Sequence, residues 1–489
     1  MPAESDIPDM SSLPDQKLLK LALLPLSAAL IAALGCGSSM LATGTQTGAS
    51  GSAFVVGTDA PLASVVSLQV QLESVELTNS SGASVNLLAA PATVDFARFN
   101  GLQGLVDMND VPAGTYTGVT IQLGTATIGY LNTATPPPTI TTETATLTTS
   151  SVSIMLNKPL TISSKSSGGV PVGLRMDLDL AQSVETSGGA ITGTVNPTFD
   201  VTTVARTDTG AHIDEFIGAV VTPPTGTAEP NSFVIQGPHG EQFTIDTTSS
   251  TEWDGNGSLS MLNTNSVVAV AGQFDPADQT LDADEVAVIS DKGFYSGGLV
   301  TYVSPSTGAA GYFDYYVRSV LPDSTPVQLG DIAQVNLTGS ETYGIYWMHN
   351  AFTNLLFNSS ALAPGQEIMV GGKASDETSL NALTVDRIHL HNWGYEGTIV
   401  AGSLNPGQGT FQMQVNGLAG VLIPSTITVY LGPNADFRFG LSAFGDLSSG
   451  VQVRVVGLLL KNSTNGQLVL LARHIDGLTL TDTAVTAWQ

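Results

Sequence analysis

Apolar and polar side chains alternate along much of this chain. Residues 65–72, 116–123 and 174–180 each place apolar side chains at every second position. A period of two predicts strands with one buried face and one polar face. Frequent glycines, turn-forming residues and the lack of long helical patterns after the first 36 residues indicate antiparallel strands joined by tight turns. Over residues 53–207 this pattern predicts a β-sandwich.

The remainder of the chain repeats one strand pattern three times. Each unit opens with aromatic-x-Gly-x-aliphatic, as FIGAV (216–220), YSGGL (295–299) and YEGTI (395–399). Each later reaches a strand that ends in glycine, as VVAVAG (267–272), IMVGG (368–372) and VRVVG (453–457). About five strands in this order indicate a small closed barrel. We therefore predict an all-β fold, with an N-terminal β-sandwich followed by three small OB-like β-barrel repeats.

These patterns divide the chain into segments, and we expect proteolytic breaks near residues 208–213, 291–293 and 391–394. The predicted segments are a signal peptide at 1–35, a lipidated cysteine with a flexible tether at 36–52, the sandwich at 53–207, barrels at 213–291, 293–392 and 393–479, and a tail at 480–489.

The front of the chain contains its single cysteine. Lys17 and Lys20 accompany an apolar run over residues 18–34, which ends in ALGC at Cys36. Such a segment is typical of an export signal and is short for a membrane span. It resembles the lipobox of bacterial lipoproteins, which implies a diacylglycerol thioether on Cys36 and cleavage before it. The alternative is a buried cysteine in a short helix. Gly37, where an aspartate retains some lipoproteins in the inner membrane, favours the outer membrane or cell surface.

Two further resemblances cover most of the remaining chain. GTDAP (57–61), VQLESVEL (70–77), VDFARFNGLQ (94–103), VPAGTYTGVTIQL (111–123) and LRMDLDLAQS (174–183) resemble the bacterial domain of unknown function 4382. The three repeats resemble the domain of unknown function 5666. The resemblance to domain 4382 implies a β fold and an exported protein and implies no chemistry, and domain 5666 is an uncharacterised bacterial family.

Charge excludes some partners. The chain has 15 Lys and Arg against 42 Asp and Glu, a net charge of −27. Phosphate backbones and anionic lipid headgroups would repel this chain, so we expect no nucleic-acid partner and membrane attachment through the lipid anchor alone.

Candidate metal ligands lie at two places. His389 and His391 share one face of a predicted strand, but the sequence offers no third ligand, and a polar outward face is the alternative. Carboxylates that could bind calcium gather around the turn FDPADQTLDADE, which a solvated acidic hairpin also explains; they are Asp275, Asp278, Asp282, Asp284 and Glu285. We expect no other cofactor.

Catalytic patterns are sparse. His-Glu-x-x-His, Cys-x-x-Cys and Gly-x-Ser-x-Gly are missing from the sequence. Asp177 and Asp179 share a strand face, which suits an acid/base pair but is more typical of a solvated edge. The second repeat is rich in aromatic residues, and Tyr343, Tyr346 and Trp347 are candidates for an exposed binding platform, with core packing as the alternative.

The sequence therefore favours a non-catalytic, lipid-anchored cell-envelope protein that acts as a spacer or as a binding module for polysaccharide or an envelope protein. The alternative is a secreted hydrolase that acts on polysaccharide through carboxylates brought together from distant segments.

Overall fold

The computed structural model describes most of the chain after residue 48. The described residues are 49–60, 65–99, 103–132, 139–169, 172–187, 190–205, 212–237, 242–254, 257–275, 280–322, 326–345, 352–373, 379–415 and 422–477. All of them belong to one compact unit, Gln46–Gln489.

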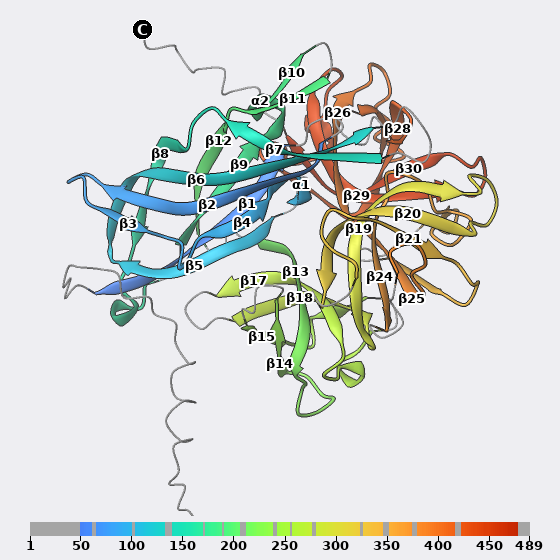
Figure 1. Ribbon diagram of the computed structural model, residues 1–489, viewed down its shortest axis with the longest axis horizontal. Coiled ribbons are helices and arrows are strands. Elements are labelled where there is room, and N and C mark those ends of the chain that lie inside the picture. The colour runs from blue at the N-terminus through green and yellow to red at the C-terminus, as the bar shows by residue number, and fades with distance from the viewer. Residues whose placement is uncertain are drawn as a thin grey trace, which may run out of the picture. The chain divides into compact units, whose positions relative to one another are not determined.

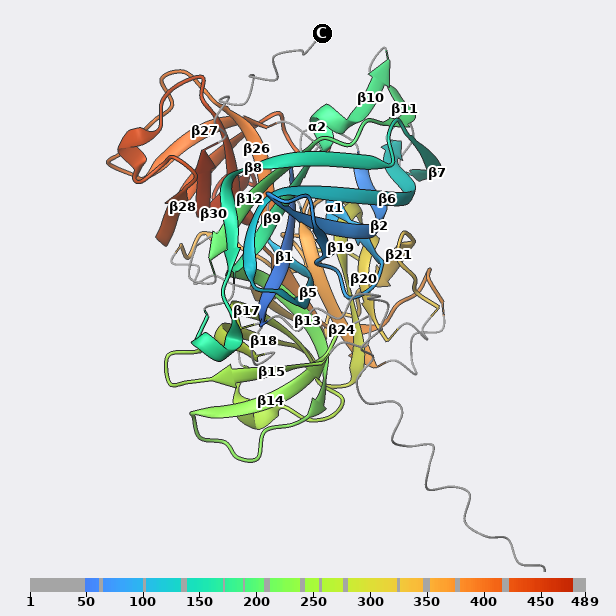
Figure 2. The same cartoon turned by 90° about the vertical axis from the view of Figure 1, so that its left-hand side faces the viewer.

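Two sheets form the N-terminal domain. The four-stranded sheet has the order β12 (Phe199–Ala205), β9 (Val172–Asp179), β1 (Ser50–Ala60), β5 (Gly104–Pro112), with β1 and β9 parallel. The larger sheet has the order β10 (Val184–Ser187), β11 (Ala190–Val195), β7 (Thr139–Leu147), β6 (Gly114–Asn132), β2 (Val65–Asn79), β3 (Ser84–Asn86); β4 (Ala92–Asp95) pairs with β2 and β8 (Ser151–Ile162) with β6. Strands β2 and β6 lie side by side in Figures 1 and 2. Short helices α1 (Phe96–Phe99) and α2 (Leu180–Ser183) connect strands.

The alternating apolar residues of the N-terminal domain form a core between its two sheets. Val55 of β1 and Met176 of β9 pack with Leu68 of β2 and Ile121 of β6 in one buried cluster. The opposite face of the four-stranded sheet is buried as well, because Phe54 and Val56 pack with the first barrel. A sandwich sheet that is apolar on both faces therefore serves as a docking surface.

The first repeat is a closed barrel. Its strands are β13 (His212–Thr222), β14 (Asn231–Gln236), β15 (Gln242–Thr247), β17 (Val267–Asp275) and β18 (Thr280–Ser290), with β16 (Glu252–Trp253) at the edge. Pairing runs β13–β14–β15–β18–β17 and returns to β13, and only β15–β18 of this ring is parallel. This is the order expected of an OB-type barrel, and Figure 1 shows these strands curled around one core.

The second and third repeats follow the same plan. The second has β19 (Gly293–Ser304), β20 (Tyr312–Leu321), β21 (Ile332–Asn336), β22 (Thr342–Ile345), β24 (Glu367–Lys373) and β25 (Val385–His391), and a bridge between Val335 and Leu383 links its ends. The third closes a ring of β26 (Trp393–Ile399), β27 (Thr410–Val415), β28 (Thr426–Arg438), β30 (Leu468–Gly477) and β29 (Gln452–Asn462). Strand β23 (Leu355–Leu356) of the second repeat pairs with β29 of the third.

The predicted fold class is confirmed: the protein is all-β, with a sandwich followed by barrel units. The repeated glycines have a steric cause. A Cβ at Gly218 would lie 2.9 Å from the carbonyl oxygen of Gln236, and one at Gly397 would clash with that of Gln414. The opening motif therefore carries glycine where the first two strands of a barrel come too close for a side chain.

Candidate functional site

The described part of the chain contains a small buried cavity where the sandwich and all three repeats meet. Arg98 comes from α1, Glu215 from β13, and Trp393 from the start of β26. The second repeat supplies most of the wall, through Tyr295, Arg318, Ser319, Glu367 and His391. The space open to the centre of a water molecule is about 20 Å³, which suits about one water-sized particle.

Arg318 is the central cation of the cavity. Its side chain is 1% exposed, and its guanidinium carbon lies 4.0 Å from the centre of the Trp393 ring. The Nη1 atom lies 3.9 Å from Glu367 Oε2, which is too far for a hydrogen bond. None of the three guanidinium nitrogens has a hydrogen-bond partner among the described residues. Arg318 is thus a buried cation held by a ring face and by a distant carboxylate.

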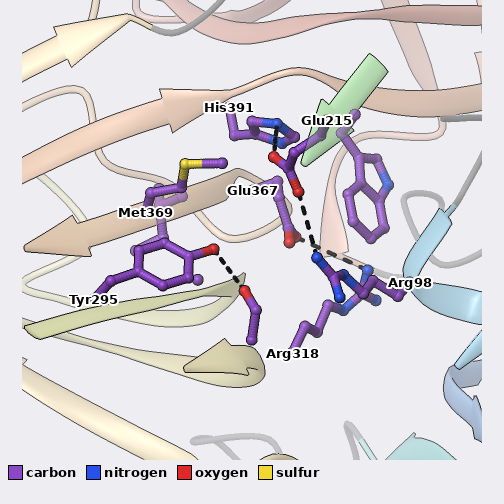
Figure 3. Close-up of a pocket in the computed structure, with 11 residues that line it drawn as sticks. Arg98, Glu215, Tyr295, Arg318, Glu367, Met369 and His391 are labelled. Atoms are coloured by element: carbon purple, nitrogen blue, oxygen red, sulfur yellow. Dashed lines mark hydrogen bonds and ion pairs between the residues drawn. The ribbon is translucent and has the colours of Figure 1, made fainter. Parts of the chain in front are cut away.

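Glu215 connects three elements. Its Oε2 lies 2.6 Å from His391 Nε2, and its Oε1 lies 3.5 Å from Arg98 Nη2. Figure 3 shows this carboxylate between the imidazole and the guanidinium. Burial alone would raise the pKa of Glu215, but the attraction of His391 and Arg98 outweighs burial and holds the pKa below its usual range. Glu215 is therefore ionised and paired.

The pKa of Glu367 shifts in the opposite direction. Burial raises its pKa to about 7, and the nearby charges of Arg318 and His391 offset this only in part, while the charge of Glu215 adds to it. Two carboxylates facing one cavity thus differ in their readiness to take a proton. Tyr295, which hydrogen-bonds Ser319 across 2.6 Å, has a pKa well above its usual value because it is buried, and therefore stays neutral.

A second charged cluster joins the first barrel, the third barrel and the sandwich. His212 lies 3.1 Å from Asp284 and 3.5 Å from Asp214, whose carboxylate also accepts the backbone N–H of Gln103 at 3.0 Å. Burial would raise the pKa of Asp214, but the hydrogen bond to His212 and the charge of Arg438 hold it well below its usual range.

The third barrel extends this cluster. Arg454 lies 2.9 Å from Glu396, and burial raises the pKa of Asp476 to about 6 despite the charges of Arg454 and Arg438. Every arginine in the described ranges belongs to an ion pair; they are Arg98, Arg175, Arg318, Arg387, Arg438, Arg454 and Arg473. Two of these pairs, Arg98 with Glu215 and Arg473 with Glu285, link different domains.

The predicted histidine pair does not lie on an outward polar face, and one of the two, His391, lines the cavity. Both side chains are buried, and His391 faces Glu215. Burial, with a smaller contribution from Arg387, lowers the pKa of His389 to about 4, so this ring is neutral. No group of three or more metal-ligating side chains occurs among the described residues. The pair therefore gains no third ligand from them.

The carboxylates of the predicted acidic turn differ in exposure and in partners. Asp282 and Asp284 are exposed on β18, and Asp284 pairs with His212. Asp275 is half-buried at the end of β17, and Asp278 lies outside the described residues. Asp177, expected on a solvated edge, is instead largely buried beside Arg175, 3.3 Å away.

Two aromatic residues of the second repeat lie at junctions with other domains. Tyr316 packs against Val66 and Leu131 of the sandwich, and Tyr295 packs against Ile217 of the first barrel. Tyr343 is half-buried in edge-to-face contact with Phe357, 5.7 Å between ring centres, and burial raises its pKa to about 12. Tyr346 and Trp347 lie outside the described residues, as does Cys36.

Sequence reasoning missed Arg98, Glu215, Arg318 and Glu367. A signal was present, because Arg318 interrupts an apolar strand (YFDYYVRSVL) and charged residues are seldom buried without a partner. No described helix has the length and apolar character needed to cross a bilayer.

Comparisons with known proteins add a family for one domain. Curated proteins give no significant match. A solved structure described as "drosophila Unr CSD456" is 12% identical, with 54% of this chain and 98% of that chain covered. The TM-score is 0.13, too low to indicate a shared fold. Residues 51–195 match the family model described as Domain of unknown function (DUF4382), so the N-terminal sandwich is similar to that family, as its sequence predicted.

Proposed function

We propose that this protein is a non-catalytic, lipid-anchored component of a bacterial cell envelope, whose sandwich and barrels form a spacer that presents a binding surface to polysaccharide or to an envelope protein. One observation carries the proposal. The buried ionisable groups face one another across domain junctions, and the cavity they surround has about 20 Å³ for a water-sized particle. A sugar ring cannot enter such a space, so these carboxylates serve the junction.

Support for the lipid anchor comes from the first residues of the chain. The basic and apolar segment that ends in ALGC resembles a lipobox, and the tether of small polar residues after Cys36 suits a body held away from the bilayer. The similarity of residues 51–195 to domain 4382, a family of exported bacterial proteins, supports an exported protein. Gly37 favours placement in the outer membrane or at the cell surface.

Lipidation has a direct test. Bacteria expressing the chain and fed labelled palmitate should attach the label to the wild type and not to Cys36→Ser, and only the wild type should remain with the membranes after fractionation. Equal labelling of the two forms would refute the anchor.

Binding and catalysis can be separated in one experiment. The mature protein, solubilised in a nonionic detergent, is incubated with cell-wall and plant polysaccharides, and both retained protein and newly formed reducing ends are measured. We expect retention without new reducing ends. Reducing ends that form with the wild type and disappear with Glu367→Gln would show a hydrolase and overturn the proposal.

A further inference from the structure

The junction cavity has a charge balance that depends on one proton. Arg98 and Arg318 carry two fixed positive charges, and Glu215 carries one negative charge. Ionisation of Glu367 adds a second negative charge to this wall, and protonation of Glu367 leaves the wall more positive by one unit charge. His391 lies 2.6 Å from Glu215 and contributes to the attraction that keeps Glu215 ionised.

The donors in the cavity are also in excess. Arg318 is almost completely buried, points its guanidinium into the cavity, and donates no hydrogen bond to a described residue. Figure 3 shows Arg98 and Arg318 on the same side of the two carboxylates. A buried cation with unpaired N–H groups has a high desolvation cost, which a small acceptor beside it would offset.

We propose that this cavity binds one small monovalent anion, of the size of a halide, on the guanidinium of Arg318, and that one proton is taken up by Glu367 together with the anion. The volume excludes phosphate, sulfate and sugar carboxylates, because it suits about one water-sized particle. The proton comes from solvent and adds to a carboxylate oxygen of Glu367, so the pair enters with no net change of charge. This inference goes beyond the proposed function, because a spacer needs no ligand at its junctions.

Other titratable groups near the cavity do not replace Glu367 in this role. Glu215 is held ionised by His391 and Arg98, and Tyr295 is a neutral phenol hydrogen-bonded to Ser319. Burial raises the pKa of Asp95, at the end of β4, but this carboxylate is outside the cavity lining and accepts hydrogen bonds from Ser67 Oγ at 2.8 Å and from the backbone of Leu68 at 2.9 Å. Glu367 alone among these carboxylates lines the cavity without a close partner.

The test uses the mature protein in a nonionic detergent, with sodium chloride exchanged for sodium gluconate at constant ionic strength. Thermal unfolding and ³⁵Cl line broadening report the bound ion. With a pKa of about 7, the fraction of protein in which Glu367 is protonated falls from about nine-tenths at pH 6 to about one-hundredth at pH 9. Only this form binds chloride, so the apparent chloride affinity should weaken roughly a hundredfold.

Two variants separate this site from general salt effects. Glu367→Gln fixes the neutral state and should bind chloride equally at both pH values, whereas Arg318→Gln should lose the chloride effect. Glu285→Gln removes a buried carboxyl elsewhere, beside Arg473, and should keep the wild-type pH dependence of chloride binding. Equal stabilisation by chloride, gluconate and sulfate, or pH-dependent chloride binding that persists in Glu367→Gln, would overturn the proposal, even if Arg318→Gln does not fold.

Discussion

Replacing Phe54 with alanine should weaken the whole body of the protein, because its ring belongs to the junction between two domains. Phe54 lies on β1 of the sandwich and is 1% exposed, yet it packs in the cluster of Phe233 and Val270 of the first barrel. Beneath it, a Cβ at Gly173 would lie 2.7 Å from its ring. The ring therefore fills a tight space between two domains.

The magnitude follows from this burial. Removal of a fully buried phenylalanine side chain costs about 3–5 kcal/mol, which includes the cavity that remains. If the sandwich and barrel did not dock, Phe54 would be exposed to solvent and its removal would change stability by only about 0.5 kcal/mol. The two cases differ by several kcal/mol, well above the error of a urea titration.

The neighbouring residue is the control. Val55 points to the other face of the same strand, into the sandwich core, so Val55→Ala should cost about 2 kcal/mol whether or not the domains dock. Urea unfolding of the mature protein, followed by far-ultraviolet circular dichroism, would compare the two. A loss for Val55→Ala together with no loss for Phe54→Ala would refute the docked junction.

Three further predictions follow from single positions. A Cβ at Gly298 would clash with a carbonyl oxygen of the adjacent strand, so Gly298→Ala should lose about 1–3 kcal/mol in urea unfolding, whereas Gly445→Ala, in open space, should change little. Burial raises the pKa of Glu285 from 4.5 to about 8, so the wild type loses folding stability as the pH rises from 4.5 to 8. Glu285→Gln is neutral at every pH and should therefore unfold at higher urea than the wild type above pH 8, and the difference should vanish below pH 4. Tyr343→Ala should lower the thermal midpoint by a few degrees, because the ring is half-buried in an aromatic pair, and an unchanged midpoint would favour the exposed-platform hypothesis.

Much of the fold could be predicted from the sequence because strands and repeats leave local marks. Alternation around Leu174 and Met176 predicts a strand wherever its partners lie. The glycine of each opening motif marks a close approach of two strands, as at Gly218 and Gly397. The pairing of β23 with β29 could not be predicted, because two residues carry no recognisable period.

The junction site could not be predicted because its chemistry arises only when domains meet. Glu215 and His391 are far apart in the sequence and belong to different repeats, and each alone looks like a polar residue at a strand end. The same holds for Tyr295 and Tyr316. Both side chains lie outside the barrel core, and neighbouring domains cover them.

The pairing of arginine with carboxylates also limits what the outer surface can bind. Every described arginine is in an ion pair, so the exposed cations of the described surface are mainly lysines, such as Lys158 and Lys373, in a chain of net charge −27. Copies of a chain with this charge repel one another within about 8 Å, the Debye length at physiological salt. A partner must therefore be neutral, basic or bridged by cations. Retention on neutral glycans should vary little with salt, and retention on acidic glycans should require divalent ions; strong retention on acidic glycans at low salt without such ions would contradict this account of the surface.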